Sequence, residues 1–114
     1  MNGVAYDEEL TERIRELLGD ERGVREQKMF GGVAFLIGGN MAVTASGQGG
    51  LMVRVDALES AELIATTDAY PMEMRGRPME GWVRVDSEHL SSKGELAPWV
   101  ERGTTYARSL PAKR

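Results

Sequence analysis

Two arginines bracket a glycine ahead of a proline in residues 75–78, and their type and spacing suit ligand recognition. Guanidinium groups bind carboxylates and phosphates through paired, charge-assisted hydrogen bonds. Arg75 and Arg77 could therefore form an anion or partner site together with Arg54 and Arg84. The same residue types are typical of an ordinary polar turn, so both interpretations stay open.

The sequence contains no constellation of residues typical of catalysis or metal binding. His89 is the only histidine and there is no cysteine, so a zinc site would need carboxylate ligands. No serine lies in a nucleophile-elbow pattern, and the acidic residues are interspersed with arginines as on a solvated helix face. We expect no catalytic residue, no metal and no cofactor, and we do not expect an enzyme.

Two adjacent glycines interrupt an apolar, strand-like run in the stretch Lys28, Met29, Phe30, Gly31 and Gly32. The stretch matches neither a phosphate-binding loop nor a dinucleotide fingerprint, because both need other glycine spacings before a helix. Glycine in a strand usually marks a bulge or a tight bend. We favour this backbone role over the alternative, in which exposed N–H groups of the stretch receive a partner.

Composition limits the class of protein. The chain has 114 residues and a net charge of −4, and its C-terminal third is mildly basic. A single domain is expected over residues 1–114, with residues 1–5 and 111–114 flexible. The missing basic patch argues against direct nucleic-acid binding by the chain alone. The lack of cysteines, of a signal peptide and of a membrane span favours a cytoplasmic protein.

Hydrophobic periodicity predicts an α+β fold. The expected elements are a helix at 7–18, strands at 24–30, 33–37, 41–45 and 51–55, a helix at 57–66, short strands around 72–74 and 82–85, and a helix starting near 94. Met41, Val43 and Ala45 should share one strand face. One two-layer domain is the simplest arrangement, with three helices on a mainly antiparallel sheet of about five or six strands (order α-β-β-β-β-α-β-β-α).

Two further expectations concern side-chain placement. In the second helix, Leu58, Ala61 and Ala65 should share one apolar face with Ile64 beside it, and in the last helix Pro98 should lie within the first two turns. Methionine fills irregular core space but also suits adaptable binding surfaces. We assign the internal methionines to the core because most lie in expected strands; they are Met29, Met41, Met52, Met72, Met74 and Met79.

Several segments resemble the N-terminal domain of the TfoX (Sxy) family of bacterial competence regulators. They include KMFGGVAFLIGGNMAV (28–43), GRPMEGWVRV (76–85) and APWVERGTTYARSLP (97–111), and the resemblance runs from about Tyr6 to Pro111. Full-length members carry a further C-terminal helical domain, so we expect this chain to be a stand-alone N-terminal domain.

The resemblance implies a non-enzymatic regulatory domain that acts through a protein partner, such as a transcription factor or RNA polymerase. The alternative is a small-molecule or anion-binding protein, including an enzyme of unknown activity, that uses an arginine-containing site. A homodimer also stays open. The residues nominated for a partner or anion surface are Lys28, Met29, Phe30, Gly31, Gly32, Arg54, Arg75, Gly76, Arg77 and Trp82.

Overall fold

Six strands form one antiparallel sheet in the spatial order β1-β2-β3-β4-β6-β5. The computed structural model describes residues 8–29 and 31–113. Its elements are α1 (Glu8–Leu17), β1 (Val24–Met29), β2 (Gly32–Ile37), β3 (Asn40–Ala45), β4 (Leu51–Arg54), α2 (Ala57–Thr66), β5 (Tyr70–Met74), β6 (Arg77–Val85), the short helix η1 (Ser87–His89) and α3 (Lys93–Ser109). The expected α+β class and element order are confirmed.

Two neighbouring rows of paired residues run across all six strands. One row is Glu26, Phe35, Val43, Val53, Val83 and Pro71, and the next is Gln27, Ala34, Thr44, Met52, Arg84 and Tyr70. Directly paired residues share a face of a sheet, and successive residues alternate between faces. The two rows therefore mark opposite faces.

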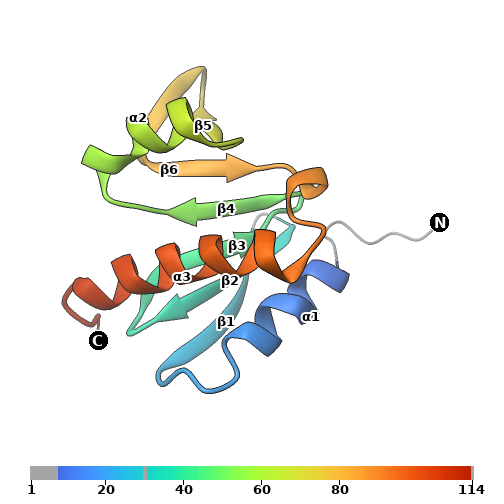
Figure 1. Ribbon diagram of the computed structural model, residues 1–114. Helices are drawn as coiled ribbons and strands as arrows, with labels where there is room; N and C mark the ends of the chain where they lie inside the picture. Colours follow the sequence, from blue (N-terminus) through green and yellow to red (C-terminus); the bar gives the residue numbers. More distant parts are fainter. Residues whose placement is uncertain (1–7, 30, 114) are drawn as a thin grey trace.

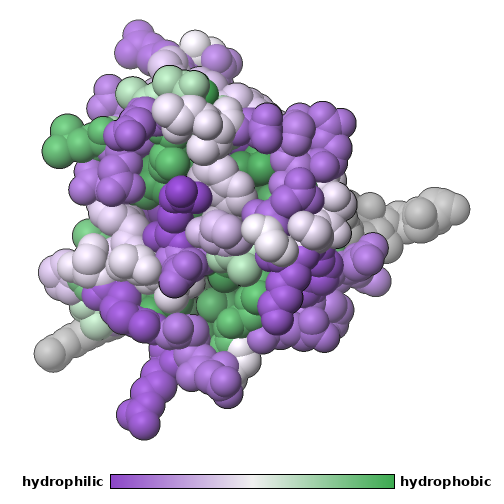
Figure 2. Space-filling model, in the orientation of Figure 1, coloured by the Kyte–Doolittle hydropathy of each residue, from purple (hydrophilic) through white to green (hydrophobic). Residues whose placement is uncertain are grey.

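The helices cover the face of the first row. Phe35, Val43 and Val53 belong to a core cluster that also contains Ile14 of α1 and Leu96 of α3. In Figure 1, α3 crosses in front of β2 and β3, with α1 beside it and α2 near β5 and β6. The surface on this side is mostly hydrophilic, with hydrophobic residues visible between polar ones (Figure 2). No helix within residues 8–29 and 31–113 covers the other side, which we call the open face.

A β-bulge in β3 overturns part of the expected strand alternation. Phe35 pairs with Val43 but Leu36 pairs with Met41, so Ala42 is an extra residue in β3. Ala42 packs in a buried cluster with Ala107 of α3, on the same side as Val43. Because the bulge shifts the alternation by one residue, Met41 turns to the open face and does not share a face with Val43.

The last helix begins with a capping box that the sequence analysis did not identify. The Ser92 hydroxyl accepts a hydrogen bond from the Glu95 amide (3.1 Å), and the Glu95 carboxylate accepts one from the Ser92 amide (3.0 Å). These bonds satisfy two groups that a helix start leaves open. Pro98 lies in the second turn of α3, as expected, where the chain is exposed.

The apolar face expected in α2, with Leu58, Ala61 and Ala65, is not the side of the helix that is buried. Leu58 is 91% exposed, whereas Ser60 and Leu63 are buried. Apolar side chains lie on more than one side of this helix, so periodicity alone does not select the buried side. Its packing against β6 selects the side that carries Leu63. Asp56 caps the helix by accepting a hydrogen bond from the Leu58 amide (2.8 Å).

The end of the chain contacts the turn between β2 and β3. The Lys113 amide donates to the carbonyl of Gly38 (2.7 Å), and the Asn40 side chain donates to the carbonyl of Pro111 (3.0 Å). The expectation for residues 1–5 lies outside the described residues. None of the described helices is long and apolar enough to cross a membrane.

Candidate functional site

All six internal methionines line one cleft on the open face of the sheet. The cleft has a volume of about 480 Å³, and we call it the methionine cleft. Its lining residues are Met29, Met41, Met52, Met72, Met74 and Met79 with Thr44, Ser46, Gly47, Gln48, Glu73, Trp82 and Arg84. None of these methionines belongs to the buried core, and Met74 is 51% exposed. The assignment of the methionines to the core is therefore wrong.

Curling of the sheet forms the methionine cleft. Met29 lies on edge strand β1, and Met72 lies on the opposite edge strand, β5. Neighbouring strands are about 4.8 Å apart, so five spacings in a flat sheet would separate these edges by about 24 Å. Side chains from both edges nevertheless line the same cleft, so the sheet must curl toward its open face.

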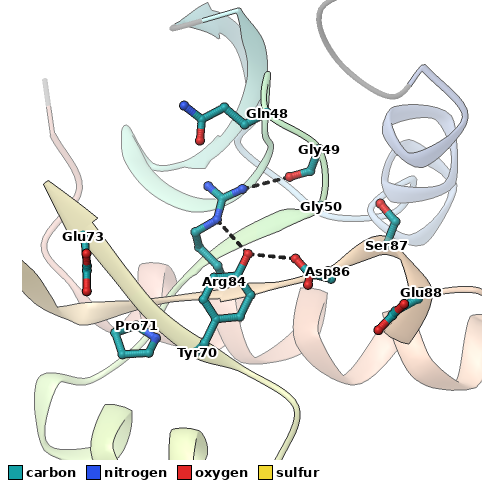
Figure 3. Close-up of a pocket in the computed structure, with 10 residues that line it drawn as sticks. All are labelled: Gln48, Gly49, Gly50, Tyr70, Pro71, Glu73, Arg84, Asp86, Ser87 and Glu88. Carbon is teal, nitrogen blue, oxygen red and sulfur yellow. Dashed lines mark hydrogen bonds between the residues drawn. The ribbon is translucent and has the colours of Figure 1, made fainter.

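Arg84 is the cationic residue that lines the methionine cleft. Its guanidinium donates hydrogen bonds to the Gly49 carbonyl (2.9 Å), the Ser46 hydroxyl (3.3 Å) and the Tyr70 hydroxyl (3.3 Å). Tyr70 in turn donates to a carboxylate oxygen of Asp86 (2.7 Å; Figure 3). All three direct acceptors of Arg84 are neutral, and no described carboxylate forms an ion pair with it.

Arg84 also lines a second, more polar hollow of about 810 Å³. Glu73 and Glu88 of this hollow lie on opposite sides of Arg84, and Asp86 lies next to Tyr70 (Figure 3). Among the described residues, no three histidine, cysteine, aspartate or glutamate side chains lie close enough together to hold a metal ion. Arg84 therefore contributes one positive charge to both the hollow and the methionine cleft. The carboxylates that line the hollow lie apart from one another around it.

Thr44 and Ser46 bring buried hydroxyls to the methionine cleft. Thr44 is 3% exposed and its hydroxyl oxygen has no hydrogen-bond partner. Ser46 is 5% exposed, and its hydroxyl oxygen accepts from both Arg84 and the Gln48 amide. An unpaired buried hydroxyl costs free energy unless a ligand or water satisfies it. Thr104 of α3 is also buried and unpaired, but among the cleft-lining residues only Thr44 has this property.

The two glycines of the 28–32 stretch have different backbone roles. Gly31 has a φ of +81° in the connection between β1 and β2, a conformation that side chains other than glycine rarely adopt. Gly32 is buried, and a Cβ there would overlap the Ala45 carbonyl and lie 2.8 Å from the Gly47 amide nitrogen. A tight connection and a close strand approach thus explain the pair. Phe30, nominated with them, lies outside the described residues.

The nominated arginines lie in separate places. The guanidinium of Arg54 lies over the rings of Trp82 and Tyr106, 5.3 and 5.5 Å from their centres. Arg75 and Arg77 are exposed at the turn between β5 and β6, where Arg75 and Gly76 both have positive φ. Four residues of β6 lie between Arg77 and Trp82, so the two are roughly 16 Å apart along the strand.

The structure does join parts of the two motif segments. Met29 from the 28–32 stretch lines the same cleft as Met79 and Trp82 from the 76–85 segment. Met74, which lines it too, pairs directly with Arg77. The sequence analysis missed the roles of Met41, Met52 and Thr44. The excess of methionines was the available signal, but their common face depends on the bulge in β3 and the curl of the sheet.

His89 has a local polar environment. Its ring nitrogens lie 3.4 Å from a carboxylate oxygen of Asp68 and 3.3 Å from one of Glu88. The residue belongs to η1, and it does not line the methionine cleft. These contacts agree with a surface role between the sheet and α3.

The fold defines an α+β domain in which helices cover one face of an antiparallel sheet and the other face carries a cleft. The sequence model of the TfoX N-terminal domain family matches residues 16–107, and the chain belongs to this family. A comparison with curated proteins gave no match.

Proposed function

We propose that this protein is a non-enzymatic regulatory domain that acts by binding a protein partner at the open face of its sheet. The observation that carries the proposal is the convergence of the two motif segments on one cleft. Met29 comes from the first segment, and Met79 and Trp82 come from the second. Loops and surfaces that bring distant segments together on a scaffold are typical of binding sites.

The chemistry of this surface supports adaptable binding. Methionine side chains are flexible and polarizable, and they adjust to partners of different shape. An exposed cation adjoins the cleft, because Arg77 pairs with Met74. Lys28 is next to Met29 on edge strand β1 and pairs with the core residue Val33, so it lies on the other face of the strand. Membership of the TfoX N-terminal domain family suggests a transcription factor or an RNA polymerase subunit as the partner, and a role in the cytoplasm.

Affinity capture from native lysate with mass spectrometry tests the proposal. The double variant Lys28→Ala, Arg77→Ala removes one exposed cation from each motif segment, of which Arg77 adjoins the cleft, and urea unfolding checks that its stability is unchanged. The matched control is Arg22→Ala, Lys93→Ala, which removes two exposed cations that do not line the cleft. We expect the wild type and the control to retain a transcription factor or polymerase subunit that the first variant loses.

Two results would contradict the proposal. One is the retention of no protein by the wild type under conditions in which the bait stays folded. The other is equal retention of the partner by all three proteins, which would place the contact elsewhere on the surface.

A further inference from the structure

We propose that the methionine cleft binds a small amphipathic anion, with its apolar body against the methionines and its anionic group at Arg84. This inference goes beyond the proposed function, because it requires no protein partner. It assigns the interior of the cleft to a ligand, whereas the proposed partner contacts the exposed residues around it.

The size and lining of the cleft suit such a ligand. Its volume of about 480 Å³ lies within the range of about 300–1,000 Å³ that is usual for small-molecule sites. Met52 of the central strand β4 and Trp82 of β6 provide thioether and ring surfaces, with other methionines on both sides. Thioethers make favourable contacts with aromatic rings, so a planar apolar body fits this lining.

Arg84 supplies the position for the anionic group. Its direct hydrogen-bond acceptors are the carbonyl of Gly49 and two hydroxyls. By contrast, Arg15 and Arg108 are ion-paired with glutamates elsewhere on the protein. A carboxylate or sulfonate at Arg84 would gain charge-assisted hydrogen bonds, which are roughly twice as strong as neutral ones.

Other polar groups around the cleft restrict how the ligand lies. The Thr44 hydroxyl, buried and without a partner, provides a further hydrogen-bonding group next to Met52, with which Thr44 is paired. Glu73 also lines the cleft, from edge strand β5. Repulsion by Glu73 disfavours an anion at that edge, so the anionic group lies at the Arg84 guanidinium near Ser46.

The form of the cleft favours a compact ligand over an extended chain. Residues of both edge strands, Met29 on β1 and Met72 on β5, bound it on opposite sides. A molecule of one or two rings fits a volume of about 480 Å³, whereas a long extended peptide exceeds it.

Two dyes of similar shape provide the test. The first, 8-anilinonaphthalene-1-sulfonate, is an aromatic anion, and the second, N-phenyl-1-naphthylamine, has the same rings without the sulfonate. Binding is measured by fluorescence titration and by NMR of protein labelled with ¹³C at the methionine methyl groups. We expect the anionic dye to shift the methyl signals of Met41, Met52 and Met79, and to bind at least about tenfold more tightly than the neutral dye.

Variants of the protein distinguish the contribution of the Arg84 charge to dye binding from that of the rest of the cleft. Arg84→Gln should weaken binding of the anionic dye by about tenfold or more and leave the neutral dye within about twofold. The control is Arg22→Gln, which removes an exposed arginine between α1 and β1 that does not line the cleft and should leave the binding of both dyes unchanged. Arg84→Gln also removes internal hydrogen bonds, so the nearly isosteric Thr44→Val provides a second variant inside the cleft. This variant should weaken the binding of the anionic dye.

The possible results decide between the alternatives. Equal affinity for both dyes, in the wild type and in Arg84→Gln, would overturn the assignment of an anion. Binding that leaves the methionine methyl signals unmoved would overturn the assignment of the cleft. If the dye binds at the methionines but no protein partner is captured, only the proposed function is rejected. If a partner is captured but the dye does not bind at the methionines, only the proposed ligand is rejected.

Discussion

A Cβ atom at Gly103 of α3 would overlap the carbonyl oxygen of Ala42 in β3. It would also lie 2.8 Å from a methyl carbon of Val43. The glycine thus lets the longest helix approach the sheet at the β3 bulge. This approach buries Ala107 against Ala42 on the helix-covered face.

We expect Gly103→Ala to destabilise the protein by about 1–3 kcal/mol, because an added methyl group in a packed site forces neighbours to move. Helix propensity alone would predict the opposite sign, since alanine is favoured over glycine by about 1 kcal/mol. Urea unfolding measures the difference. The control is Gly94→Ala in the first turn of the same helix, where the nearest atom to a Cβ would be the Ser92 hydroxyl oxygen at 3.8 Å. A stabilised Gly103→Ala would show that the helix does not approach the sheet this closely.

The two glycines at the start of β2 should respond differently to substitution. Gly31 has a positive φ, so Gly31→Ala should cost about 1–2 kcal/mol and Gly31→Asn less. At Gly32 a side chain would meet the backbone of Ala45 and Gly47. Gly32→Ala should therefore cost more than Gly31→Ala, and Gly32→Asn should cost still more. Thermal or urea unfolding of the four variants tests this order, and equal costs at both positions would contradict it.

Acid should weaken the contact between α1 and β1. The Arg15 guanidinium donates to both carboxylate oxygens of Glu26 (2.6 and 2.8 Å), and this hydrogen bonding lowers the pKa of Glu26. A carboxyl group whose pKa is lowered by folding stabilises the protein above its unfolded-state pKa, and the contribution is lost as the pH falls through the folded-state pKa.

Stability measured between pH 7 and pH 3 should therefore fall less steeply in Glu26→Gln than in the wild type. The effect should be small because both side chains are more than one-third exposed and water screens the pair. Glu62→Gln is the control, since Glu62 is exposed on α2 and its side chain has no ion pair among the described residues. If stability falls with pH equally steeply in Glu26→Gln and in the wild type, this ion pair does not contribute to the acid sensitivity.

Peroxide should oxidise the methionines of the open face without unfolding the protein. Oxidation to the sulfoxide makes a methionine polar and disrupts a core that contains it. Here the six internal methionines line a cleft outside the core, and Met74 is the most exposed. We expect Met74 to react first, with Met41 and Met52 following while the circular dichroism spectrum stays native. Peptide mass spectrometry measures the rates, and oxidation of Met52 only under unfolding conditions would contradict the placement.

Local patterns determined the elements of this protein. The alternation in residues 51–55 and the apolar stripe of Leu10 and Ile14 each reflect contacts between near neighbours, so the helix and strand periods could be read directly. The order of elements and the α+β class followed from them. The TfoX motifs also identified the family, because they depend on residue identity and order and not on long-range geometry.

Only the tertiary structure decided which sides of these elements are buried. The bulge at Ala42 reverses the side of Met41, and packing against β6 turns Leu63 inward and leaves Leu58 exposed. The cleft exists because the sheet curls toward its open face and side chains from both edge strands line it. A sequence period specifies two sides of a strand, but contacts between residues far apart in the chain decide which side meets the helices and which remains open.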